Sequence, residues 1–106
     1  MKIVATAEDF RLAAYYRNNL NNGASYTCLV NQAVKRTLED AVPNRISVGT
    51  EYVEVNMDNS YNNPSWLTYK LDVTGKHLVN LFDAGVTEAD FHFPVEFEMT
   101  PIKLDW

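Results

Sequence analysis

The sequence predicts an α+β fold in which two or three helices pack on one face of a small antiparallel sheet of four to five strands. Two observations indicate this class. Strand-like and helix-like periodicities follow one another in the order β-α-α-β-β-β-α-β, and each patterned segment has one apolar side that must be covered. In addition, 106 residues with 46% apolar content suffice for one core, so we expect a single domain over residues 1–106.

The first two elements are a short strand over residues 2–5 and a helix that starts after Thr6. Thr6 is suited to cap this helix, and Asp9, three residues later, completes a pattern that resembles a capping box. The helix ends in an Asn-rich stretch that runs to Gly23, because Asn and Gly tolerate the left-handed conformation of a helix end.

A second helix is predicted over residues 26–41, with Ser25 as its cap. Apolar side chains recur along it at four-residue spacing and form one broad stripe, whereas Asn31 and Lys35 fall on the polar side. This placement puts Cys28 in the first turn of the helix.

The next part of the chain is mostly strand-like. The alternation of apolar residues changes phase at Gly49, which predicts two strands, or one bent strand, across residues 45–56. A polar loop over residues 57–65 precedes a strand at 66–71, and Asp72 then caps a third helix.

The last strand is predicted over residues 91–99. Its odd-numbered residues are apolar, so they face the core, and the opposite side carries His92, Glu96 and Glu98. Pro94 cannot donate to a strand ladder, which indicates an edge strand or a strand that is paired on one side at this point. A free edge at 91–99 would allow a homodimer to form by strand pairing.

Charge is distributed unevenly along the chain. The net charge is −5, yet residues 1–50 carry six Lys and Arg against four Asp and Glu, whereas residues 51–106 carry three against ten. The acidic half predicts a surface that competes with phosphate for a basic groove on a protein partner. The residues expected to contact that partner are Asp58, Tyr61, Asp90, His92, Glu96 and Glu98.

The basic half offers an alternative function. Arg17, Lys35 and Arg36 lie near several tyrosines in the sequence, and phosphate contacts combined with stacking hold nucleotides and single strands. The excess of positive charge is small for a nucleic-acid-binding domain. The alternative is therefore a protein that binds a small ligand, a nucleotide or a nucleic acid, and nucleic acid is the least expected of the three.

The short motifs that identify common enzymes do not occur in the sequence, among them the Walker A motif, G-x-G-x-x-G, G-x-S-x-G and H-E-x-x-H. We therefore expect a protein that is not an enzyme and holds no cofactor or metal. The remaining alternative is an activity that depends on Cys28, since the first turn of a helix stabilises a thiolate. The sequence has one cysteine and no apolar run of membrane-spanning length, so we expect a cytoplasmic protein with no membrane partner.

Three stretches resemble a family of small bacteriophage-encoded proteins. TCLVNQAVKRTL resembles their C-P-[VI]-A-x-A-[VIL]-x-R-x-L helix, and RISVGTEYVEV resembles the V-x-V-G strand that follows it. YKLDVTGKHLVNLFDAG with PVEFEM resembles their helix ending in F-D-x-G and their closing strand. The resemblance covers most of residues 26–99 and implies a shared fold and a phage origin, with action in the bacterial cytoplasm.

An acidic phage protein without catalytic motifs is expected to act by occupying the surface of a host protein. The candidate targets are a host defence complex and a host transcription or replication factor. Inhibition of a defence complex would make the action of the chain similar to that of anti-CRISPR proteins.

Overall fold

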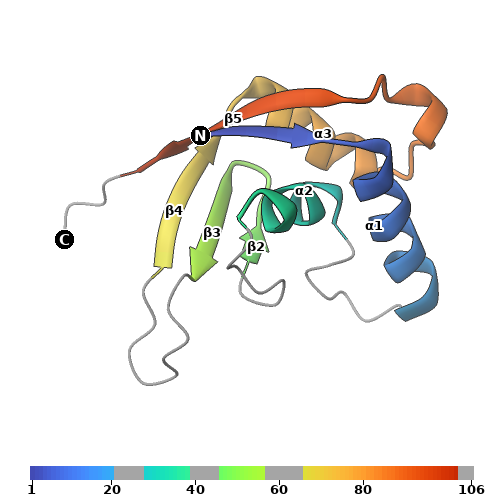
Figure 1. The fold of residues 1–106 in the computed structure, drawn as a ribbon, viewed down its shortest axis with the longest axis horizontal. Helices are drawn as coiled ribbons and strands as arrows, with labels where there is room; N and C mark the ends of the chain where they lie inside the picture. Colours follow the sequence, from blue (N-terminus) through green and yellow to red (C-terminus); the bar gives the residue numbers. More distant parts are fainter. Residues whose placement is uncertain (21–27, 39–45, 57–65, 103–106) are drawn as a thin grey trace.

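The computed structural model describes residues 1–20, 28–38, 46–56 and 66–102, which form three α-helices and a curled antiparallel sheet (Figure 1). The element order is the predicted one, and the fold is α+β. The helices pack on one face of the sheet, and the side chains that alternate toward its other face are mostly exposed. In this part of the chain no helix is long and apolar enough to span a membrane.

Five strands make up the described sheet, in the spatial order β1-β5-β4-β3-β2, so β1 and β2 are its edges. The strands are β1 (Lys2–Ala5), β2 (Ile46–Val48), β3 (Tyr52–Asn56), β4 (Trp66–Leu71) and β5 (Val95–Pro101). The helices are α1 (Ala7–Leu20), α2 (Leu29–Thr37) and α3 (Val73–Asp83), with a short 3-10 helix, η3 (Glu88–Asp90), before β5.

The predicted start of α1 is confirmed. The Asp9 backbone N–H donates to Thr6 Oγ1 at 3.3 Å, and the Thr6 backbone N–H donates to Asp9 Oδ2 at 2.9 Å. These reciprocal bonds satisfy two donors that a helix start otherwise leaves free. The cap of α3 is confirmed as well, because Asp72 Oδ1 accepts from the Gly75 N–H at 2.7 Å.

The helix α2 starts later than predicted and buries a residue expected on its polar side. It begins at Leu29, and Cys28 is its N-cap in extended conformation, so Cys28 does not lie in the first turn. Asn31 is buried, and its Nδ2 donates to Ile46 O at 2.9 Å. The apolar stripe could not predict this, because α2 contacts elements on several sides, namely α1, α3, β1 and β2. The predicted cap, Ser25, lies outside the described residues.

The helix α2 lies against both edge strands of the curled sheet (Figure 1). The antiparallel ladders turn the carbonyl groups of Val4 in β1 and Ile46 in β2 away from the strand beside them. Arg36 Nη2 donates to Val4 O, and Asn31 Nδ2 donates to Ile46 O. Both outward-facing carbonyls therefore find their partners on α2.

Residues 46–56 form two strands, which confirms one of the two predicted arrangements, two strands rather than one bent strand. β2 and β3 join in a tight turn in which the Gly49 N–H donates to Tyr52 O at 2.9 Å. The predicted loop over residues 57–65 lies outside the described residues.

The last strand begins at Val95, and the prediction of a strand over 91–99 was wrong at both ends. Pro94 precedes the strand, so its missing N–H leaves no gap in a ladder. β5 is also not an edge strand, because its first half pairs with β1 and its second half with β4. Within the described strands each half of β5 is paired on one side only, and the homodimer expected through this strand stays a prediction.

The core lies between the curled sheet and the helices. Strand residues that point inward are almost fully buried, among them Phe97 and Met99 of β5, whereas Val95 at the start of β5 is partly buried. The largest fully buried side chains are Phe82, Phe97, Ile3, Leu29, Ile46, Leu71 and Met99.

Candidate partner-binding site

Four of the six residues predicted to contact a partner lie among the described residues. Asp90 ends η3 and His92 follows it, and both are exposed. Glu96 and Glu98 lie farther along, on the exposed outer face of β5. Asp58 and Tyr61 lie outside the described residues.

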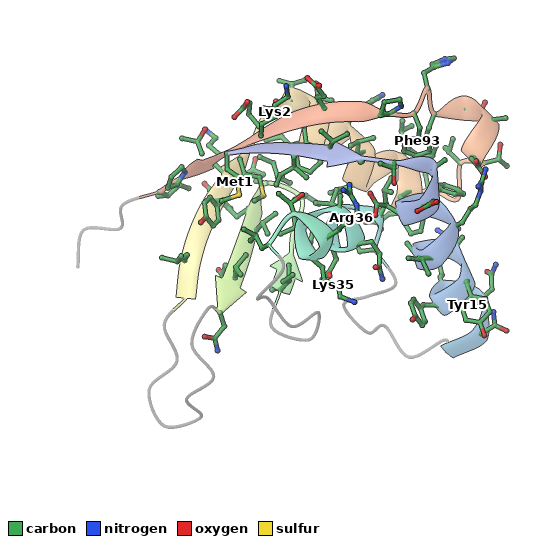
Figure 2. The ribbon with its side chains drawn as sticks, viewed as in Figure 1. Met1, Lys2, Tyr15, Lys35, Arg36 and Phe93 are labelled. Carbon is green, nitrogen blue, oxygen red and sulfur yellow. The ribbon has the colours of Figure 1, made fainter. Side chains whose placement is uncertain are left out.

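The two acids on β5 are matched by positive groups at the start of the chain. Lys2 Nζ lies 3.2 Å from Glu96 Oε2, and the Met1 amino group lies 3.4 Å from Glu98 Oε2 (Figure 2). These pairs are exposed and therefore sensitive to salt, but they balance the formal charge of this face. The outer face of β5 is thus less acidic than the sequence alternation alone suggests.

A more distinctive feature lies where α1, η3 and the segment before β5 meet. It is an open hollow of about 510 Å³, called here the α1–η3 hollow. Phe93, partly buried, lies near the start of α1 (Figure 2). The residues that line the hollow are Ala7, Glu88, Ala89, Phe91 and Phe93.

The floor of the α1–η3 hollow is aromatic. The rings of Phe91 and Phe93 are stacked, with centroids 5.3 Å apart and planes inclined by 13°. Phe10 of α1 packs against both rings, at 5.3 Å and 6.0 Å, and in turn meets Phe82 of α3 at 5.4 Å. The floor of the hollow is therefore continuous with the core.

One acid lines this hollow, and two others follow lining residues in the chain. Glu88 lines it, Glu8 lies in the first turn of α1 beside Ala7, and Asp90 ends η3. Arg11 Nε and Nη2 donate to the two carboxylate oxygens of Glu88 at 3.2 Å and 2.8 Å, and this pairing raises the pKa of Arg11. Within the described ranges, Glu8 and Asp90 have no ion-pair partner.

The start of α1 does not turn the hollow into an anion site. A helix start carries partial positive charge, but the acidic side chains of Glu8 and Asp9 already occupy the first turn. Asp9 also uses one oxygen to accept the N–H of Thr6. The partial positive charge at the start of α1 is therefore already offset by acids of its own first turn.

The sequence signal for this site was incomplete. Alternation assigned Phe91 and Phe93 to the core and Asp90 to the surface, which agrees with their burial except that Phe93 remains partly exposed. No sequence pattern indicated that the other lining residues, Ala7, Glu88 and Ala89, belong to a binding site. The fold alone brings the start of α1 against η3, and no short-range pattern encodes that contact.

A second, smaller hollow lies on the β2–β3 hairpin. Its volume is about 330 Å³, and its polar lining contains two exposed acids, Glu51 and Glu54, beside the exposed Tyr52. Neither acid has an ion pair with a described residue. This hollow lacks the apolar floor that the α1–η3 hollow has.

The predicted phosphate-binding residues are not gathered at one site. Arg36 donates to both Asp9 oxygens, at 3.2 Å and 3.1 Å, and this hydrogen bonding raises the pKa of Arg36. Arg17 Nη1 donates to Phe82 O at 2.8 Å, and its guanidinium lies over the Phe82 ring, 4.2 Å from the centroid. Lys35 is exposed on α2 (Figure 2). Two of the three cations are therefore engaged in contacts between elements of the fold.

Cys28 has the environment of a packing residue. It is partly buried against the core, and this burial raises the pKa of its thiol above the usual 9.0, although backbone hydrogen bonds from Asn31 and Val30 oppose the shift. A raised pKa keeps the thiol protonated at neutral pH, whereas a nucleophile requires the thiolate. Among the described residues, no three His, Cys, Asp or Glu side chains are grouped so as to hold a metal ion.

No protein-family model matches this chain, and no curated protein or solved structure matches it either. The resemblance to bacteriophage-encoded proteins therefore depends on the three sequence stretches alone.

Proposed function

We propose that this chain is an interaction protein that binds another protein through the α1–η3 hollow. The observation that carries the proposal is the stacked pair of Phe91 and Phe93, which forms the floor of an open hollow and leaves Phe93 partly exposed. Protein interfaces concentrate their binding energy in such places, where an aromatic anchor and a pocket together exclude water.

Two further exposed apolar side chains on α1 support the proposal that the ligand is a protein. Leu12 and Tyr15 are 47% and 60% exposed, although most large apolar residues of the described chain are buried. Tyrosine is enriched in interfaces because its ring adds contact area while its hydroxyl can hydrogen-bond. These side chains would enlarge a contact that starts at the hollow.

The resemblance to bacteriophage proteins supports a bacterial host protein as the partner. A host defence complex is the first candidate, and occupation of its surface would inhibit it. A transcription or replication factor is the second candidate.

Capture of bacterial proteins by the immobilised chain tests this proposal. Phe93→Ser should lose the captured protein, whereas Tyr52→Ser should retain it. Tyr52 is a suitable control because it is also an exposed aromatic residue, at 44%, but belongs to the β2–β3 hairpin. Circular dichroism and thermal unfolding of both variants would verify that each remains folded.

A double variant distinguishes the hollow from the strand face predicted by the sequence. Glu96→Lys with Glu98→Lys reverses the charge on the outer face of β5 and should leave capture intact. If this variant loses the partner and Phe93→Ser keeps it, the partner binds to β5, and the assignment to the hollow is wrong.

A further inference from the structure

We infer that the α1–η3 hollow takes an apolar side chain from a partner segment that carries Lys or Arg on both sides of it. This inference rests on the proposed function and adds the chemistry of the partner.

The apolar part of the inference follows from the lining. Phe91 and Phe93 supply ring surface, Ala7 and Ala89 supply methyl groups, and Glu88 is the one charged residue among the lining side chains. The volume of about 510 Å³ lies in the range of about 300–1,000 Å³ that ligand pockets occupy, but the hollow is open. An open apolar hollow suits a side chain that is held from outside by its own backbone.

The basic part follows from the rim. Glu88 lines the hollow and is paired with Arg11. Two further acids, Glu8 and Asp90, each directly follow a lining residue in the chain, Ala7 and Ala89. Positive side chains that flank the inserted group would meet Glu8 and Asp90 without displacing an existing ion pair. Because these acids are exposed, the attraction would contribute mainly to the association rate and would weaken with salt.

Other surfaces of the described chain fit this partner less well. The acids on β5 already have positive partners in Lys2 and the Met1 amino group. The hollow on the β2–β3 hairpin has unpaired acids but no apolar floor. The α1–η3 hollow thus combines an apolar floor with acids that are free to pair.

Three capped peptides of the same length can test the inference in an NMR titration of the full chain. The probe has a central Phe between two pairs of Lys, the second peptide has Ala in place of Phe, and the third has Glu in place of every Lys. The first peptide should shift the amide resonances of residues 88–93 and of the start of α1. The other two should bind at least about tenfold more weakly, which corresponds to about 1.4 kcal/mol. Equal binding of all three would overturn the inference.

A pair of variants at one exposed position separates charge from shape. Ala89 lines the hollow and is exposed, so substitution there should not disturb the core. Ala89→Lys should weaken binding of the Lys-flanked peptide by about tenfold, because it places a like charge at the hollow. Ala89→Glu adds a side chain of similar length but of opposite charge and should strengthen binding.

The outcomes distinguish the inference from the proposed function. If both variants weaken binding equally, the hollow takes an apolar group without regard to charge, so the inference is wrong and the proposed function stands. If neither variant changes binding, the probe binds elsewhere and the inference is wrong, whereas the capture experiment with Phe93→Ser still tests the proposed function. If the chain self-associates in sedimentation experiments and Ala89→Lys abolishes this, the occupant is a second copy of the chain, which also overturns the inference.

Discussion

Two arginine–carboxylate pairs hold α1 against its neighbours, and they differ in burial but hardly in geometry. Arg36 of α2 binds Asp9 with two bonds of 3.2 Å and 3.1 Å, and Arg11 binds Glu88 of η3 with two bonds of 3.2 Å and 2.8 Å. The Asp9 side chain is 3% exposed, whereas that of Glu88 is 37% exposed. Water can replace the lost partner of Glu88 but not that of Asp9. The same bonding pattern is therefore structural at one site and part of a modifiable surface at the other.

The largest expected effect comes from removal of the guanidinium at the buried site. Arg36→Ala should lower the free energy of unfolding by about 3 kcal/mol, the lower end of the range for breaking a buried pair, because Arg36 itself is half exposed. Urea denaturation measures this loss. The double variant Asp9→Asn with Arg36→Ala should recover part of it, since the buried charge is then gone. Full stability of Arg36→Ala would show that the two pairs do not differ.

The matching change at the exposed site should affect binding more than folding. Arg11→Ala should shift the melting temperature by no more than a few degrees, because Glu88 can be hydrated in its place. The same variant frees a third carboxylate at the α1–η3 hollow, so affinity for the Lys-flanked peptide should rise by about twofold to threefold at low salt. If Arg11→Ala lowered stability as much as Arg36→Ala, the two ion pairs would not differ in their contribution to folding.

The smallest effect is expected on the outer face of β5. Glu96→Gln breaks an exposed pair with Lys2 and should change the free energy of unfolding by less than about 0.5 kcal/mol. Binding of the Lys-flanked peptide should also stay the same, since Glu96 lies outside the hollow. Weaker binding in this variant would extend the partner surface along β5.

Local signals in the sequence predicted the parts of the fold that short-range contacts determine. Thr6 and Asp9 are three residues apart, so their capping interaction could be read directly, and the same holds for Asp72 with Gly75. The alternation over residues 91–99 correctly predicted which side chains are buried, although residues 91–94 are not in a strand. Side chains of an extended backbone alternate between two sides whether or not the backbone hydrogen-bonds to a neighbouring strand. The pattern therefore predicts which side each side chain is on but not whether the segment pairs with another strand.

Long-range contacts determine the parts that the sequence could not predict. Arg36 looked like a phosphate ligand because its partner, Asp9, lies on another helix. Glu96 looked like an available acid because its cation comes from β1. The α1–η3 hollow needs the start of α1 and the segment before β5 in contact, and these lie near opposite ends of the described chain.

The contacts of α2 with both sheet edges have a consequence for the behaviour of the protein at high concentration. Strand edges with free backbone groups are templates for aggregation, and this sheet has two, at β1 and β2. Arg36 and Asn31 occupy one outward-facing carbonyl on each. Detachment of this nine-residue helix would uncover both edges at once, while the central strands remained paired. The covering of both sheet edges thus depends on the shortest α-helix among the described residues.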